Sequence, residues 1–100
     1  MNAGRFFAPS YAQAREGFLA AADAIGLDVH SHGHPLRGRD GEALAMDVVL
    51  DGDPGAEALL MITSACHGVE GYCGSGVQGA LLADDGFRAA AREAGVSVLY

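Results

Sequence analysis

The residues of this sequence that could do chemistry are concentrated in one segment, SACHGVEGYCGSG, at positions 64–76. His67 and Glu70 form an H-x-x-E pair, and this spacing lets a turn bring an imidazole nitrogen and a carboxylate onto one metal ion. Zinc accepts such a mixed ligand set, and a catalytic zinc site uses three protein ligands plus water. Gly68 and Gly71 permit the backbone bend that the pair requires. The segment is therefore a candidate metal site.

The spacing alone is weak evidence for a metal, because H-x-x-E often occurs by chance. The alternative is structural. In that case His67 caps a helix or hydrogen-bonds within its own loop, and Glu70 is solvated. From the residues alone the structural interpretation is favoured, and the metal interpretation stays open.

Two other chemistries fit this segment less well. Residues 74–79 spell G-x-G-x-x-G, but a dinucleotide site needs that pattern directly after a strand and an acid at the end of the next strand. Residues 96–100 contain no acid. Cys66 and Cys73 do not form C-x-x-C, and a thiol–imidazole pair needs spatial contact that adjacent residues on an extended segment lack. We expect both cysteines to be small buried residues that pack beside a strand end.

Three further histidines alternate in HSHGH, at positions 30, 32 and 34. Alternation on a strand places side chains on one face, where they could bind a metal. The sequence supplies no carboxylate partner for them. A solvated strand end that enters a loop is therefore the favoured interpretation.

The first half of the chain predicts one helix and two strands. Ser10 and Gln13 form a capping box ahead of a helix over residues 11–25, and Gly26 is placed to end it. Residues 27–32 are predicted as a strand and residues 33–42, which contain a proline, as a loop. A second, half-buried strand follows from the alternation over residues 44–50.

The second half of the chain surrounds the candidate site. Residues 58–62, ALLMI, are apolar on both faces, which predicts a central strand covered by helices on both sides. Helices over residues 76–85 and 85–95 and a strand over residues 96–100 complete a βαβ unit. The fold class is α/β, and the candidate loop leaves the carboxyl end of a strand, where open α/β sheets bind ligands.

Composition and charge exclude several classes of partner. The formal net charge is −7, and the six basic residues are all arginines without a cluster, so nucleic acid is not an expected partner. No apolar run approaches the length of a membrane span. The first residues lack the apolar centre of a signal peptide. We therefore expect a cytoplasmic protein that contacts no membrane and keeps its two thiols free.

Three stretches along the chain carry a resemblance to a known family. They are SYAQAREGFLAAA, HPLRGRDGEALAMDV and HGVEGYCGSGVQGALL, and the last is the most specific because it joins H-x-x-E to a long run of small residues. In these stretches the chain resembles the bacterial domain-of-unknown-function family grouped with the carboxypeptidase A-like zinc peptidases. That wider group includes the succinylglutamate desuccinylases and aspartoacylases. The resemblance implies a mixed α/β sheet flanked by helices, with residues 1–100 as the N-terminal portion of a single, truncated domain.

The same resemblance implies a zinc ion held by His67 and Glu70, with a later histidine as third ligand and a still later glutamate as general base. The expected reaction is hydrolysis of an amide bond in a small peptide or an acyl-amino acid, in which zinc lowers the pKa of water and polarises the carbonyl. After Glu70, however, the sequence has no histidine. Its later acids match no base motif of the family; they are Asp84, Asp85 and Glu93.

Two hypotheses of function follow. The first is the N-terminal portion of a carboxypeptidase-like zinc amidohydrolase that is inactive alone and contributes His67 and Glu70 as metal ligands. The second is a non-catalytic α/β module that associates with itself through an open sheet edge at residues 96–100, because an unpaired strand is a docking surface.

Overall fold

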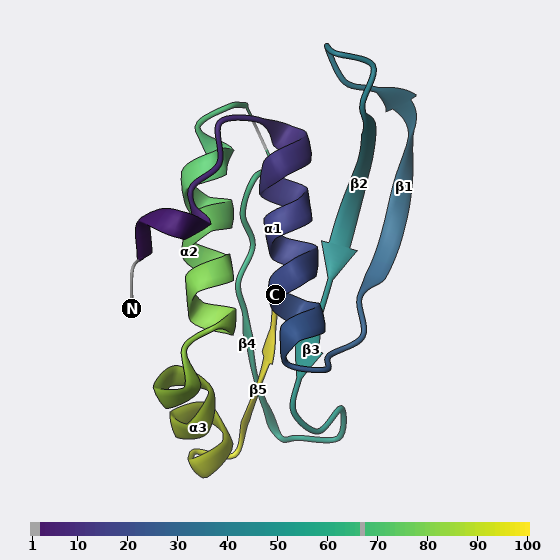
Figure 1. The fold of residues 1–100 in the computed structure, drawn as a ribbon. Coiled ribbons are helices and arrows are strands. Elements are labelled where there is room, and N and C mark those ends of the chain that lie inside the picture. Colours follow the sequence, from purple (N-terminus) through teal and green to yellow (C-terminus); the bar gives the residue numbers. More distant parts are fainter. Residues whose placement is uncertain (1–2, 67) are drawn as a thin grey trace.

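The computed structural model describes residues 3–66 and 68–100 (Figure 1). In chain order its elements are a 3-10 helix η1 (Ala3–Phe6), α1 (Tyr11–Ala24), β1 (His30–Arg37), β2 (Ala43–Val48), β3 (Leu50–Asp51), β4 (Ala58–Met61), α2 (Gly71–Leu82), α3 (Asp85–Glu93) and β5 (Val96–Leu99). This mixture of helices and strands confirms the predicted α/β class.

The strands of the described chain form two small sheets that one segment connects. β1 pairs antiparallel with β2, and the other sheet has the order β3-β5-β4. Between β2 and β3, Val49 exchanges both backbone hydrogen bonds with Tyr100, at 3.0 and 2.8 Å, so the ladder continues from one sheet to the other. β4 runs parallel to β5 and reaches it through α2 and α3, which confirms the predicted βαβ unit.

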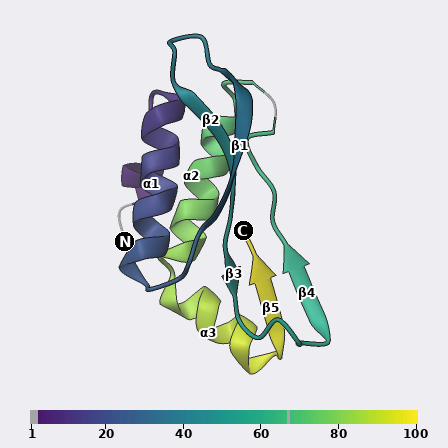
Figure 2. The same ribbon diagram turned by 90° about the vertical axis from the view of Figure 1, so that its right-hand side faces the viewer.

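The helices α1 and α2 lie side by side on one face of the sheets, and α3 lies at the end where β5 begins (Figures 1 and 2). The core is the layer between these helices and the strands. Its buried residues are Phe18, Ala22, Val49, Leu82, Val98 and Tyr100. In the described part of the chain, the opposite face of the sheets carries no helix (Figure 2).

Two predictions about the strands are therefore wrong. β4, predicted as a buried central strand, is an edge strand, and the side chains of Leu59 and Met61 are 55% and 59% exposed. β5, predicted as the open edge of the sheet, is the central strand between β3 and β4. An apolar run shows that a strand can be buried on both faces, but the strand order decides which strand receives that cover.

The β1–β2 hairpin also differs from the prediction. β1 begins later than the expected strand and extends through the expected loop as far as Arg37, which pairs with Ala43. The register shifts between Gly33 and Arg37. Pro35 is tolerated there because β1 pairs with β2 alone in the described residues, and proline is acceptable on an edge strand or at a bulge.

The predicted ends of the helices agree with the structure better than the predicted strands do. The Ser10 side chain accepts a hydrogen bond from the Gln13 backbone N–H at 3.2 Å, and Gly26 ends α1 with a φ of +74°. Asp84 caps α3 by accepting from the Phe87 backbone N–H at 3.0 Å. α2 is the exception, because it begins at Gly71, earlier than the predicted residue 76.

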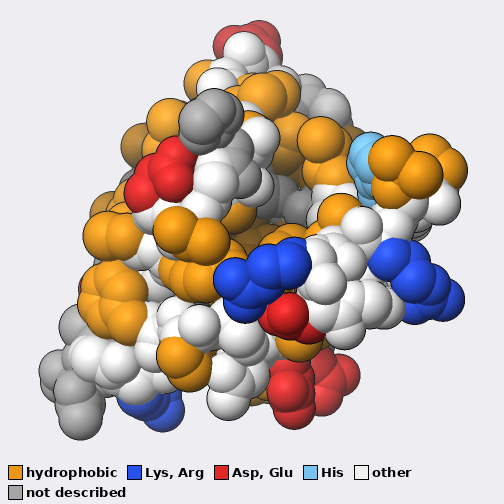
Figure 3. Space-filling model, turned by 90° about the horizontal axis from the view of Figure 1, so that it is seen from above, with side chains coloured by type: hydrophobic (Ala, Val, Ile, Leu, Met, Phe, Trp, Pro, Cys, Tyr) orange, Lys and Arg blue, Asp and Glu red, His pale blue; other side chains and the backbone are white. Residues whose placement is uncertain are grey.

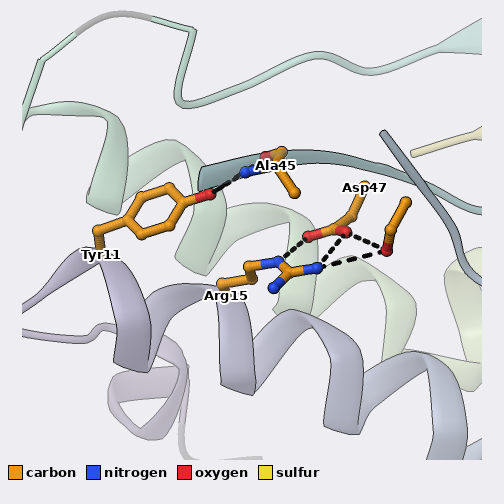
Figure 4. Close-up of polar contacts among 5 residues, drawn as sticks. Tyr11, Arg15, Ala45 and Asp47 are labelled. Atoms are coloured by element: carbon orange, nitrogen blue, oxygen red, sulfur yellow. Dashed lines mark hydrogen bonds and ion pairs between the residues drawn. The ribbon is translucent and has the colours of Figure 1, made fainter. Parts of the chain in front are cut away.

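Polar contacts fix the hairpin to α1 (Figure 4). Arg15 donates to both carboxylate oxygens of Asp47, at 2.8 and 3.0 Å, and the Ser31 hydroxyl donates to the same carboxylate at 2.6 Å. The Tyr11 hydroxyl donates to the Ala45 carbonyl oxygen at 3.1 Å. Burial acts to raise the pKa of Asp47, but the hydrogen bonds from Arg15 and Ser31 outweigh it and hold that pKa below its usual value.

Candidate functional site

The candidate site is the loop of residues 62–70, which leaves the carboxyl end of β4 and enters the N-terminus of α2 (Figure 1). The predicted ligand His67 lies outside the described residues. The other predicted ligand, Glu70, is exposed and occupies the N-cap position of α2. Its position at the end of a parallel strand agrees with the place where α/β sheets bind ligands.

The Glu70 carboxylate turns back over its own loop. Its Oε1 accepts a hydrogen bond from the Gly68 backbone N–H at 3.3 Å. A Cβ atom on residue 68 would lie 2.7 Å from Oε2. A side chain at position 68 would therefore displace the Glu70 carboxylate from its present place over the loop.

A buried glutamine, Gln78, anchors the start of this loop to α2. Its Nε2 donates to the Ile62 carbonyl oxygen, and its Oε1 accepts from the Ser64 hydroxyl at 2.8 Å. Gln78 is 7% exposed. Sequence reasoning missed this residue, although a polar side chain inside an otherwise apolar and small-residue helix is a signal that could have found it.

The glycines at the start of α2 let the same loop approach the helix backbone. A Cβ atom on Gly71 would lie 2.6 Å from the Cα of Ala65, and one on Gly74 would lie 2.9 Å from the Cβ of Ser64. Ala65 itself has a φ of +58°, a conformation that costs energy for a residue with a side chain. The loop is thus held against α2 in a strained backbone conformation.

The second half of the glycine pattern serves packing as well. A Cβ atom on Gly76 would lie 2.7 Å from the ring of Phe7, and one on Gly79 would lie 3.2 Å from the ring of Phe6. The last two glycines of G-x-G-x-x-G therefore let the N-terminal residues pack closely on α2. They lie within the helix, whereas in a dinucleotide site the pattern opens it.

The prediction of buried cysteines is wrong. Cys66 and Cys73 are both free and exposed. Cys66 lies in the loop after β4, and Cys73 lies on an exposed position of the first turn of α2. The Cys66 sulfur lies 3.6 Å from the Ser64 carbonyl oxygen.

A cleft of about 600 Å³ opens beside the candidate loop. Val69 and Tyr72 line it from the loop and α2, Arg39 and Asp40 line it from the tip of the hairpin, and Tyr11 lines it from α1. Figure 3 looks onto this end of the molecule and shows a hollow bordered by apolar and charged side chains. The cleft therefore reaches Val69 and Tyr72 on either side of Glu70, which does not itself line it.

Glu70 is the one predicted zinc ligand among the described residues. An imidazole and a carboxylate are ordinary zinc donors, and Glu70 is exposed at the position where it would be needed. Residues 3–66 and 68–100 contain no group of three histidine, cysteine, aspartate or glutamate side chains that could hold a metal ion. The described residues thus fit zinc in donor type but do not complete a site around Glu70.

The remaining predicted candidates lie elsewhere. His30, His32 and His34 are exposed on β1, in the hairpin, so they lie on a different element from the candidate loop. No helix in the described part of the chain has the length and apolar character needed to cross a membrane.

A known protein family matches most of the chain. The family described as "Protein of unknown function (DUF2817)" matches residues 7–100. No curated protein and no solved structure matches the chain.

Proposed function

Because this chain belongs to the DUF2817 family, whose description names no activity, we propose a function from the site: the chain supplies His67 and Glu70 as zinc ligands to a carboxypeptidase-like amidohydrolase. The substrate class is a small peptide or an acyl-amino acid, and the bond that breaks is an amide. Zinc bound there supplies a water of lowered pKa and polarises the amide carbonyl.

The observation that supports this proposal is the placement of Glu70. Its segment follows the carboxyl end of a parallel strand and borders a cleft through Val69. Gln78 and the α2 glycines hold the preceding loop residues in place, at Ile62, Ser64 and Ala65. Rigid support of this kind is what a metal ligand needs, because ligands must be held in a fixed geometry. A merely solvated turn needs no buried glutamine beneath it.

The proposal also limits what the chain does alone. The sequence contains no histidine after Glu70, so residues 71–100 offer no second imidazole as third ligand. A zinc ion held by His67 and Glu70 has half of its usual four donors from this chain. We therefore propose that the chain alone binds zinc weakly and hydrolyses no amide.

Zinc titration of the purified chain tests the proposal. We expect one zinc ion per chain, with an affinity that falls by about tenfold or more in His67→Ala and in Glu70→Gln, since each change removes one of two protein donors. The measurement is competition with a chromophoric zinc chelator in a Cys66→Ser/Cys73→Ser background, because both thiols are exposed.

The matched controls are Glu57→Gln and His34→Ala, which remove an exposed acid and an exposed histidine outside the loop. They are expected to leave the zinc affinity unchanged. Equal affinities for all variants would contradict the zinc site. Turnover of an N-acetyl-amino acid by the zinc-loaded chain, lost in His67→Ala, would contradict the proposed inactivity.

A second candidate function is self-association through the open sheet edge, which the structure places at β4 rather than at β5. β4 pairs with β5 on one side only in the described chain, and its three large residues are exposed on both faces: Leu59, Leu60 and Met61. We propose that two copies pair through β4 across a twofold axis.

Sedimentation velocity tests this second candidate. We expect the metal-free chain to form a dimer that Met61→Lys converts to a monomer, since a lysine on an edge strand opposes edge-to-edge pairing. The matched control is Leu36→Lys on β1, where the native side chain is 68% exposed, and it is expected to leave the dimer intact. A monomeric wild-type chain would exclude the candidate.

A further inference from the structure

The β1–β2 hairpin has two faces, and the polar contacts with α1 identify them. Ser31 pairs with Asp47 in the strand register, and both side chains turn toward α1, where Arg15 binds them (Figure 4). Successive side chains on a strand point to opposite faces. His30 and His32, which flank Ser31, therefore point to the face away from α1.

The same face carries a third metal-binding side chain. Met46 is the register partner of His32, and its side chain is 65% exposed. Directly opposed residues in an antiparallel pair have Cβ atoms about 4.5–5.5 Å apart, and residues two apart on one strand are separated by about 7 Å. Two imidazoles and a thioether can therefore reach one ion without a change in the backbone.

The donor types select the metal. Thioether sulfur is a soft ligand that favours Cu(I), and imidazole suits copper as well as zinc. A chain with a net charge of −7 also raises the local concentration of cations. We propose that His30, His32 and Met46 form a surface site for Cu(I), separate from the H-x-x-E loop and independent of the function proposed for that loop.

The neighbouring His34 does not belong to this site. The strand register is interrupted after Gly33, and the Nδ1 atom of His34 accepts a hydrogen bond from the Leu36 backbone N–H at 3.0 Å. His34 is thus an exposed histidine of the same strand that is committed to a local contact. It provides the matched control for the two proposed ligands.

Competition for Cu(I) against bicinchoninate, under ascorbate and without oxygen, tests the site. The background protein is Cys66→Ser/Cys73→Ser/His67→Ala. It lacks both cysteine thiols and the one histidine that lies outside β1. We expect one Cu(I) per chain, with affinity lowered about tenfold or more by His30→Ala, His32→Ala and Met46→Leu, because each removes a ligand. His34→Ala is expected to leave the affinity unchanged.

A second measurement separates ligation from an indirect structural role. The Met46 Cε methyl resonance is expected to shift on addition of Cu(I) in the background protein, because thioether sulfur is a soft ligand for Cu(I). The native side chains are exposed, so the variants are expected to retain the thermal stability of the background. The assignment would be overturned if the Met46 methyl resonance did not shift, or if Met46→Leu left the Cu(I) affinity unchanged. It would also be overturned if His34→Ala lowered the Cu(I) affinity as much as His30→Ala and His32→Ala do.

Discussion

Replacement of Asp51 by alanine is expected to lower the free energy of unfolding by about 2 kcal/mol, because it leaves a largely buried arginine without its counter-charge. Asp51 on β3 accepts two hydrogen bonds from Arg88 on α3, at 2.8 and 3.3 Å. The two side chains are 9% and 13% exposed. This ion pair connects α3 to the sheet beneath it. The loss of stability is measured by urea unfolding followed by circular dichroism.

The environment of this pair explains the size of the expected effect. The Tyr100 hydroxyl is buried beside it and has no hydrogen-bond partner in the described chain. Burial raises the pKa of Tyr100, and the Asp51 carboxylate raises it further. The hydrogen bond to Asp51 raises the pKa of Arg88, so the guanidinium stays charged. The pair is therefore held in its charged form between α3 and the sheet.

Two comparisons make the prediction specific to a buried pair. Arg39 and Asp40 form an ion pair with side chains that are 89% and 67% exposed. Exposed pairs contribute little to stability, so Asp40→Ala is expected to leave the unfolding midpoint nearly unchanged. The double variant Asp51→Leu/Arg88→Met is expected to recover most of the lost stability, because it removes both charges. A loss in Asp51→Ala no larger than that in Asp40→Ala would contradict the prediction.

Local features of the fold were predictable from the sequence because they depend on neighbouring residues. The Ser10 cap, the Gly26 stop and the βαβ order follow from side-chain chemistry and periodicity within a few turns. The exposure of β4 was not predictable in this way. Residues 58–62 are apolar enough for a central strand, and only the pairing of β5 with both β3 and β4 makes β4 an edge.

In the candidate site, too, the sequence indicates the local features but not the contacts between distant residues. The type and spacing of His67 and Glu70 indicate metal chemistry in the sequence, whereas the support beneath the start of the loop depends on contacts between distant residues. Gln78 is bonded to Ile62 and Ser64, and the α2 glycines matter because the loop and the N-terminal residues pack against them. Such contacts leave no periodic pattern, so a run of small residues can be mistaken for a phosphate loop.

Replacement of Gln78 by leucine is expected to lower the free energy of unfolding by about 2 kcal/mol and to release the loop that carries Glu70. Leucine is close to glutamine in size, so the change leaves little cavity and removes mainly the two hydrogen bonds. The Ile62 carbonyl oxygen and the Ser64 hydroxyl then lose their bonds to Gln78. A buried polar group without a partner costs about 1–3 kcal/mol.

Amide hydrogen exchange in the loop distinguishes its release from a general loss of stability. Amide hydrogen exchange is expected to accelerate over residues 64–66 and at the start of α2 in Gln78→Leu, while the amides of α1 keep their relative protection. Ser64→Ala, which removes one of the two hydrogen bonds, is expected to show a smaller change in the same direction. If His67 and Glu70 bind zinc as proposed, Gln78→Leu also weakens zinc binding, because strain at Ala65 is no longer opposed by the anchor. Unchanged exchange in this loop would show that the glycine contacts of α2 alone hold it.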